Sequence, residues 1–276
     1  MISMKYSFVC EEDGKNIKRF LSENIDGFSL AKIDRQLKLG EIRINGKKTR
    51  ENILLSFGDK VDIFIPESMV EAPVIETVYE DDNIIVVFKP VNTDTENNLV
   101  RLVSSKIGLK VFAVHRLDRN TEGLVILAKD RETESLLMRA IKERKIIKTY
   151  RALLSGTFEN KKFTATAYLK KDEKAAKVNV FSLPVSGAKE IVTRFETVAE
   201  YDGYSDVEIE LVTGRTHQIR AHAAFLGHPV LGDGKYSTNS INNKFGFKRQ
   251  QLRAVKLVFG GCKGKLEYLN GKVIKV

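Results

Sequence analysis

The strongest constraint on the fold is a short apolar run that directly follows a charged segment. Residues 124–128, Leu-Val-Ile-Leu-Ala, carry no polar side chain, which is typical of a strand buried on both faces. The preceding loop, at residues 115–119, sets four ionisable side chains around one leucine: His115, Arg116, Asp118 and Arg119. Charged residues are rarely buried unless they are paired. The pattern therefore predicts either a functional site or, with equal weight, a surface loop of salt bridges.

Asp118 is the candidate for chemistry in this segment. Arg116 and Arg119 flank it, and nearby cations favour the charged form of a carboxylate. An ionised, partly desolvated carboxylate can act as a nucleophile or as a base. The residues alone therefore make Asp118 a candidate catalytic group.

The same segment resembles a known signature. His-Arg-Leu-Asp at residues 115–118, with Thr121 and then Gly123-Leu124, is similar to the signature of the RluA-type pseudouridine synthases. The resemblance implies that Asp118 is the catalytic residue. The family usually has serine before the glycine, where this chain has Glu122, and this departure lies outside the catalytic dipeptide.

A second block of the family is similar to residues 148–152, Lys-Thr-Tyr-Arg-Ala. The resemblance implies that Tyr150 stacks on the target uracil, and an aromatic platform holds a base by about 1–3 kcal/mol. Taken alone, Tyr150 would be a core or cross-strand aromatic, since Tyr150, Ala152 and Leu154 share one face of the expected strand. Because Tyr150 stands where the family's order of blocks has the stacking tyrosine, the stacking role is the preferred interpretation.

A third block is residues 214–220, Gly-Arg-Thr-His-Gln-Ile-Arg. The resemblance implies that Arg215 pairs with Asp118, and a bidentate guanidinium would fix the orientation and charge of that carboxylate. We expect no metal here. His217 and His222 are five residues apart, so a helix does not set them side by side, and no cysteine or carboxylate cluster joins them.

Composition points to a polyanionic partner. The formal net charge is +10, which favours nucleic acid first and an acidic membrane second. No apolar run approaches the length of a membrane span, and acidic residues at 11–13 interrupt any signal-peptide core. Cys10 and Cys262 form neither a disulfide framework nor a zinc pattern. We expect a cytoplasmic protein with reduced thiols and no membrane partner.

The N-terminal residues predict a small domain of two helices and short strands. One helix is expected from Ile17 to about Asn24, and Ser29 caps a second that Gly40 closes. An Asn-Gly turn at residues 45–46 follows an alternating strand. The pattern resembles the RNA-binding domain of ribosomal-protein-S-four type, the αL fold. Its candidate RNA contacts are Lys32, Arg35, Lys38, Arg43 and Lys47, although a solvated helix face is the plainer alternative.

The chain is accordingly divided into an RNA-binding domain at residues 1–66, a linker at 67–73 and a catalytic domain at 74–276. The resemblance implies a mixed α/β (α+β) catalytic fold with a largely antiparallel central sheet. Within it we expect a helix from Asp130 to about Lys145, a solvated lysine-rich loop at residues 170–177, and a terminal hairpin of residues 266–269 and 272–276.

The resemblance implies an RNA pseudouridine synthase, which must flip the target uridine out of an RNA stem. We expect its substrate to be large-subunit ribosomal RNA, 23S or its precursor, because of the N-terminal domain. We also expect a monomer, and no cofactor, because no step needs redox chemistry, an electron sink or a metal. Asp118 would attack the anomeric carbon, attack carbon 6 of the ring, or remove a sugar proton. The expected RNA contacts of the catalytic domain are Arg116, His115, Arg119, Lys148, His217 and Arg220. The alternatives are a transfer-RNA pseudouridine synthase, a non-catalytic RNA-binding or ribosome-assembly protein, and a metal-dependent nuclease, which would need clustered carboxylates.

Overall fold

The computed structural model describes residues 3–25, 28–66, 73–172 and 177–276. The chain divides into two compact units, Met1–Val74 and Ile75–Val276. Most of the predicted linker, residues 67–72, lies outside the described residues. No helix within the described residues is both long and apolar enough to cross a membrane.

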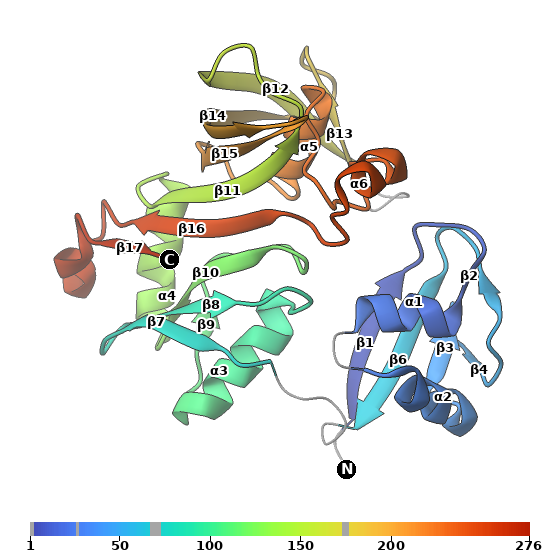
Figure 1. Ribbon diagram of the computed structural model, residues 1–276. Helices are drawn as coiled ribbons and strands as arrows, with labels where there is room; N and C mark the ends of the chain where they lie inside the picture. Colours follow the sequence, from blue (N-terminus) through green and yellow to red (C-terminus); the bar gives the residue numbers. More distant parts are fainter. Residues whose placement is uncertain (1–2, 26–27, 67–72, 173–176) are drawn as a thin grey trace. The chain divides into compact units, whose positions relative to one another are not determined.

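The N-terminal unit is a four-stranded antiparallel sheet with two helices (Figure 1). The strand order is β1-β6-β3-β4, and a separate pair, β2 and β5, completes the unit. The elements are β1 (Ser3–Val9), β2 (Lys15–Asn16), α1 (Ile17–Asn24), α2 (Leu30–Leu39), β3 (Ile42–Ile44), β4 (Lys47–Thr49), β5 (Leu54–Leu55) and β6 (Lys60–Pro66).

Local sequence signals set the ends of these elements. The Ser29 side chain accepts a hydrogen bond from the Lys32 amide at the start of α2, and Gly40 ends the helix in the left-handed conformation. Asn45 and Gly46 both have positive φ, as a two-residue hairpin turn requires, and they join β3 to β4. The predicted caps and turn are confirmed. Apolar faces of both helices and the sheet form one core, with Ile17, Leu21, Ile33, Leu37 and Ile63 fully or almost fully buried.

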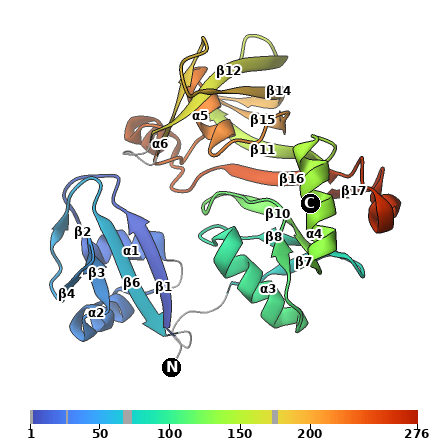
Figure 2. The ribbon, with the colours of Figure 1, turned by 180° about the vertical axis from the view of Figure 1, so that it is seen from behind.

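The second unit is built on one large sheet, most of whose pairs are antiparallel (Figures 1 and 2). The order is β13-β12-β14-β15-β11-β16-β10-β8-β7, with β17 beside β16 and β9 beside β10. The strands are β7 (Glu76–Glu80), β8 (Ile84–Lys89), β9 (Phe112–Ala113), β10 (Glu122–Ala128), β11 (Ile147–Ser155), β12 (Lys162–Asp172), β13 (Lys177–Phe181), β14 (Lys189–Tyr201), β15 (Tyr204–Leu211), β16 (Leu252–Val258) and β17 (Val273–Lys275).

Helices cover both faces of the central strands. Along β8 and β10, alternate residues join two different cores: Val87 and Val125 belong to one, Val86 and Leu124 to the other. The first core includes residues of α3 and α5, the second residues of α4 and a 3₁₀ helix. The elements are a π-helical turn (Thr95–Leu99), α3 (Val100–Ile107), α4 (Arg131–Lys142), α5 (Gln218–Phe225), α6 (Asn239–Phe245) and the 3₁₀ helix (Gly264–Leu269). The expected double burial of residues 124–128 is confirmed.

Gly123 allows the central strands to meet. β10 and β16 pair in parallel, with Gly123 opposite Ala254. A Cβ at Gly123 would lie 2.2 Å from the Ala254 carbonyl oxygen, and the residue has a φ of +118°. Only glycine fits such a close approach of two backbones. The glycine that ends the charged loop is therefore needed to join the two halves of the sheet.

Two predictions about the catalytic unit are wrong. Residues Gly264–Leu269 form a 3₁₀ helix instead of a hairpin strand, because Leu266 and Leu269, three apart, are both buried. The last strand, β17, pairs with β16 instead. The start of the predicted lysine-rich loop is also strand, since β12 continues to Asp172 and pairs with β13. The last residue of that loop, Lys177, begins β13, and residues 173–176 lie outside the described residues.

Candidate active site

The loop between β9 and β10 presents Asp118 from a fixed base. Leu117 is buried, and its amide and carbonyl both bond to the hydroxyl of Thr95, which is itself buried. The Thr121 amide donates to the Asp118 carbonyl over 3.0 Å and closes a turn. The Asp118 side chain is left 20% exposed. The apolar residue at the centre of the charged segment is thus the anchor that holds the carboxylate at the surface of a cleft.

A buried lysine holds this loop from behind. Lys89, at the end of β8, is fully buried, and its ammonium donates to the carbonyls of Pro90, Thr93 and Arg119 over 2.9–3.1 Å. Burial lowers the pKa of Lys89 to about 7, against the opposing effect of the Asp118 charge. Lys89 ties the loop after β8 to the loop of Asp118. This role was not predicted from the sequence, although a lysine at the end of an apolar strand was the available signal.

The cation that pairs with Asp118 is Arg220. Its Nη1 lies 3.0 Å from Oδ2 of Asp118, while its Nε and Nη2 make a two-point pair with Asp233 at 2.6 and 2.9 Å. Burial opposes the charge on Arg220, but the Asp233 and Asp118 carboxylates outweigh it and raise the pKa of the guanidinium. Asp233 is 1% exposed, and Arg220 keeps its pKa low despite that burial. Arg220 is therefore fixed by one carboxylate while it holds the other.

The prediction that Arg215 pairs with Asp118 is wrong. Arg215 lies in the exposed loop before α5, and its side chain makes no ion pair within the described residues. Arg220 is the third residue of α5, whose first turn is fixed by Gln218. The amide oxygen of Gln218 accepts from Arg215 N and the Thr213 hydroxyl, and its nitrogen donates to the Thr193 hydroxyl. The helix start therefore turns residue 220, and not 215, towards the catalytic loop.

The arginines beside Asp118 in sequence also point elsewhere. Arg116 is exposed and pairs with Glu96 at 3.1 Å, and Arg119 donates from Nε to the Asn92 carbonyl at 3.3 Å. The ion pair with Asp118 comes from Arg220, far along the chain, and the expected effect of the two flanking arginines on Asp118 stays a prediction. Glu122, the departure from the family pattern, forms an ion pair with Arg253 across β10 and β16.

Two histidines near Asp118 are neutral at ordinary pH. Nε2 of His115 accepts a hydrogen bond from the Ile126 amide at 3.1 Å, and burial lowers its pKa to about 3. His217 has Nδ1 2.8 Å from the Tyr236 hydroxyl and Nε2 3.8 Å from Asp118. Burial lowers its pKa to about 4, although the Asp118 charge opposes this. Their predicted contacts with RNA would accordingly be hydrogen bonds without a positive charge.

Tyr150 lies on β11 with its ring against the core. It is 6% exposed, and Ala152 and Leu154 on the same face are buried too, as the alternation predicts. Burial, and then the Asp118 charge, raise the pKa of the phenol well above its ordinary value near about 10. A phenolate is thus disfavoured here, which favours the stacking role over base catalysis.

These side chains surround a single cleft of about 280 Å³. Of the predicted site residues, those lining it are His115, Arg116, Asp118, Lys148, Tyr150, Arg215, His217 and Arg220. Arg119 is not among them, and Lys32, Arg35, Lys38, Arg43 and Lys47 belong to the N-terminal unit. Three blocks far apart in sequence therefore meet around one carboxylate, and the salt-bridge-loop alternative does not account for that convergence.

The described residues contain no cluster of three or more histidine, cysteine, aspartate or glutamate side chains suited to a metal. His222 has Nδ1 3.0 Å from the Thr193 hydroxyl, and His228 has Nδ1 2.9 Å from the Ser155 carbonyl. Both are engaged in structural contacts, and neither lines the cleft.

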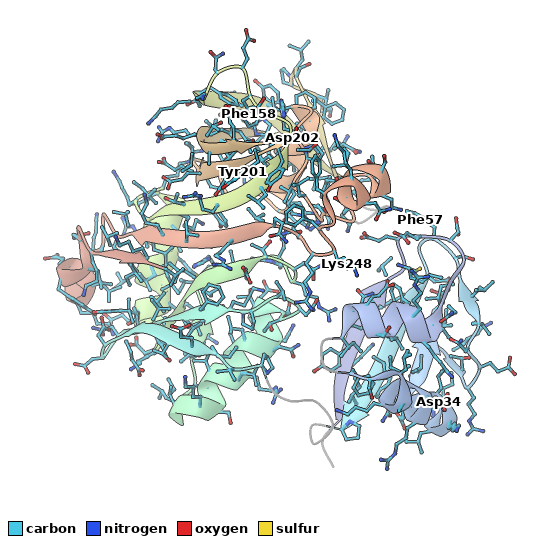
Figure 3. All side chains as sticks on the ribbon, in the orientation of Figure 1. Asp34, Phe57, Phe158, Tyr201, Asp202 and Lys248 are labelled. Carbon is cyan, nitrogen blue, oxygen red and sulfur yellow. The ribbon has the colours of Figure 1, made fainter. Side chains whose placement is uncertain are left out.

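In the N-terminal unit, the predicted basic residues lie on α2, β3 and β4. Arg35, Lys38 and Lys47 are exposed. Asp34, labelled in Figure 3, forms ion pairs with Lys38 and with Lys18, so it partly neutralises this face. Arg43 lies 5.0 Å from the ring centroid of Phe64. The surface remains basic, and its contact with RNA stays a prediction.

Comparison with known proteins identifies the class. Residues 82–225 match the family model described as RNA pseudouridylate synthase, and the chain belongs to this family. It is therefore an isomerase that acts on RNA. A solved structure, human RNA Pseudouridylate Synthase Domain Containing 1, shares the fold with a TM-score of 0.61, at 24% identity over 75% of this chain and 90% of that one.

Several bacterial relatives are more similar in sequence to this chain than the human protein is. "Ribosomal large subunit pseudouridine synthase C" of Salmonella typhi is 31% identical, over 92% of this chain and 87% of that protein. The protein of the same name from Escherichia coli strain K12 is 30% identical with the same coverage. "Uncharacterized RNA pseudouridine synthase YlyB" of Bacillus subtilis is 27% identical over 90% of this chain.

Proposed function

We propose that this protein isomerises specific uridines of large-subunit ribosomal RNA to pseudouridine, with Asp118 as the catalytic residue. The names of two relatives that are 30–31% identical to this chain support the choice of RNA. A transfer RNA substrate is the alternative. The observation that carries the proposal is the carboxylate of Asp118, part exposed in a cleft and held by the buried Arg220.

The chemistry needs a positioned carboxylate and room for one base. The uracil must leave the ribose, rotate and rejoin through carbon 5, which is impossible for a base stacked within a stem. The target nucleotide would therefore flip into the cleft and stack on Tyr150, which lines it. Arg116, exposed at the rim, would fill the vacated space or hold the backbone.

Asp118 would act in one of three ways: attack on the anomeric carbon, attack on carbon 6, or removal of a sugar proton. All three need the carboxylate charged and oriented, and the hydrogen bond from Arg220 orients it. Because the hydrogen bonds of Arg220 to Asp233 fix its guanidinium before substrate arrives, little reorganisation is needed during the reaction.

The test is a map of pseudouridine in RNA from cells that lack this protein. We expect sites in large-subunit ribosomal RNA to disappear, to return with the wild-type gene and to stay absent with Asp118→Asn. If pseudouridine disappears only from transfer RNA, the substrate is transfer RNA and not ribosomal RNA. Full restoration of the sites by Asp118→Asn would refute the catalytic assignment.

A further inference from the structure

Lys148 is the second residue of β11, close in the strand to the predicted stacking residue. It precedes Tyr150 by two residues on β11, so both side chains leave the same face of the strand. Both line the cleft that contains Asp118. The Lys148 ammonium lies against Gly214, where an added Cβ would be 3.7 Å from Nζ. The lysine is thus held between the second and third sequence blocks.

The ammonium of Lys148 is unpaired within the part of the chain that the structure describes. It makes no hydrogen bond or ion pair within residues 3–25, 28–66, 73–172 and 177–276. The carboxylates on the neighbouring strand β15 are engaged by other cations: Asp206 by Arg151, Glu208 by Lys256 and Glu210 by Arg194. Asp118, in the same cleft, is bound to Arg220.

An unpaired cation in a partly closed cleft is unfavourable without an anion. Burial lowers the pKa of Lys148, and no carboxylate offsets this effect. Most polar groups that are buried have a partner, so one without a partner calls for an explanation. Lys89 and Arg220, the other largely buried cations of this site, both have theirs. The explanation that fits Lys148 is a charge that awaits the substrate.

We propose that Lys148 binds a backbone phosphate flanking the target nucleotide, once that nucleotide has entered the cleft. This deepens the proposed function and rests on it. The phosphate is the one group of a uridine in RNA that carries a full negative charge before reaction. Neighbouring same-face residues on a strand are about 7 Å apart, so Lys148 lies beyond a base stacked on Tyr150, where its backbone can pass. A cation here would be screened less by salt than a surface lysine.

The test combines a protein change with a change in the RNA. Lys148→Met would be compared with wild type on an RNA in which one flanking phosphate at a time is a neutral methylphosphonate. Lys142→Met is the matched control, because Lys142 is exposed on α4 and outside the cleft. Binding and single-turnover pseudouridine formation are both measured, and Lys148→Arg tests rescue by charge. Thermal melting checks that the variants fold.

We expect Lys148→Met to weaken binding of normal RNA by about ten- to a hundredfold, the worth of one hydrogen bond to a charged group. Neutralising the right phosphate should weaken wild type similarly but should barely affect Lys148→Met, and Lys148→Arg should retain most of the affinity. Lys142→Met should respond to the neutral linkage as wild type does. The proposal is overturned if, for each methylphosphonate, the loss of binding free energy adds to the loss caused by Lys148→Met.

A Lys148→Met defect confined to the rate, and unchanged by either neutral linkage, would also overturn it. That result would place the lysine at the uracil oxygens instead, where charge develops as the base leaves. Failure of the proposed function is a separate outcome: wild type would then form no pseudouridine in the RNA at all, whatever its phosphates.

Discussion

Substituting Arg220 by methionine tests the centre of the site. The guanidinium joins the buried Asp233 to the catalytic candidate Asp118 through three hydrogen bonds of 2.6–3.0 Å. Methionine fills a similar volume but leaves Asp233, 1% exposed, without its counter-ion. Removing one partner of a buried ion pair destabilises a protein by about 3–5 kcal/mol. We expect a loss of that size in the free energy of unfolding.

The rate should fall as well, for a separate reason. Asp118 would lose the group that orients it, and small misplacements of a catalytic group reduce rates by about a hundredfold. Adding Asp233→Asn to Arg220→Met removes the unpaired charge. The double variant should therefore regain part of the stability and none of the activity. This separation distinguishes an orienting role from a merely structural one.

Urea unfolding and single-turnover pseudouridine formation are the two assays, and Arg215→Met is the control. Arg215 is exposed and unpaired within the described residues, so its loss should change the free energy of unfolding by less than about 0.5 kcal/mol. The reasoning is refuted if Arg220→Met is stable and active. It is equally refuted if Arg215→Met, in which Arg220 is still paired with Asp118, lowers the rate as much as Arg220→Met does.

Three further predictions concern the carboxylate, pH and the N-terminal unit. Asp118→Asn should keep RNA affinity, which comes mostly from phosphate contacts elsewhere, while single-turnover formation of pseudouridine drops to background. A rate comparable to that of the wild type would exclude Asp118 as the catalytic residue. His115 and His222 have pKa values lowered by burial to about 3 and about 4. The unfolded chain binds these protons from about pH 6.5 downwards, so stability should fall between pH 6.5 and 4, by up to about 1.4 kcal/mol per unit for each histidine. Urea unfolding that is flat over this range would contradict the assigned burial. Removing residues 1–66 should reduce the salt dependence of RNA binding, and equal salt slopes for full-length and truncated protein would show that this unit is no RNA contact.

Local signals in the sequence were sufficient for much of the fold. The cap at Ser29, the left-handed Gly40 and the Asn45-Gly46 turn each depend on neighbours in the chain, so they were predictable. The strand at residues 124–128 was equally clear, because an unbroken apolar run has few other environments. The 3₁₀ helix at Gly264–Leu269 was missed because a short run with a leucine every third residue next to an Asn-Gly pair also suits a hairpin.

The partners of charged residues were less predictable, for a physical reason. Which cation reaches Asp118 depends on how α5 sits against the sheet, and Gln218 determines where that helix starts. Arg215 and Arg220 are only five residues apart, so sequence spacing does not choose between them. Asp233 and Lys89 were missed as supports because each acts through groups distant along the chain.

The buried charges explain why so much of this unit serves one carboxylate. Asp233 and Lys89 are at most 1% exposed, and both are fully bonded to groups that lead to the catalytic loop: Asp233 through Arg220, and Lys89 through the Arg119 carbonyl. Buried charges destabilise a fold unless every donor and acceptor has a hydrogen-bond partner. The site therefore tolerates little displacement of any residue in this network. Asp118 is the member of this network with 20% exposure, and it faces the cleft. The rigid, paired charges therefore lie behind the reacting group, while Lys148, which has no partner among the described residues, lines the cleft itself.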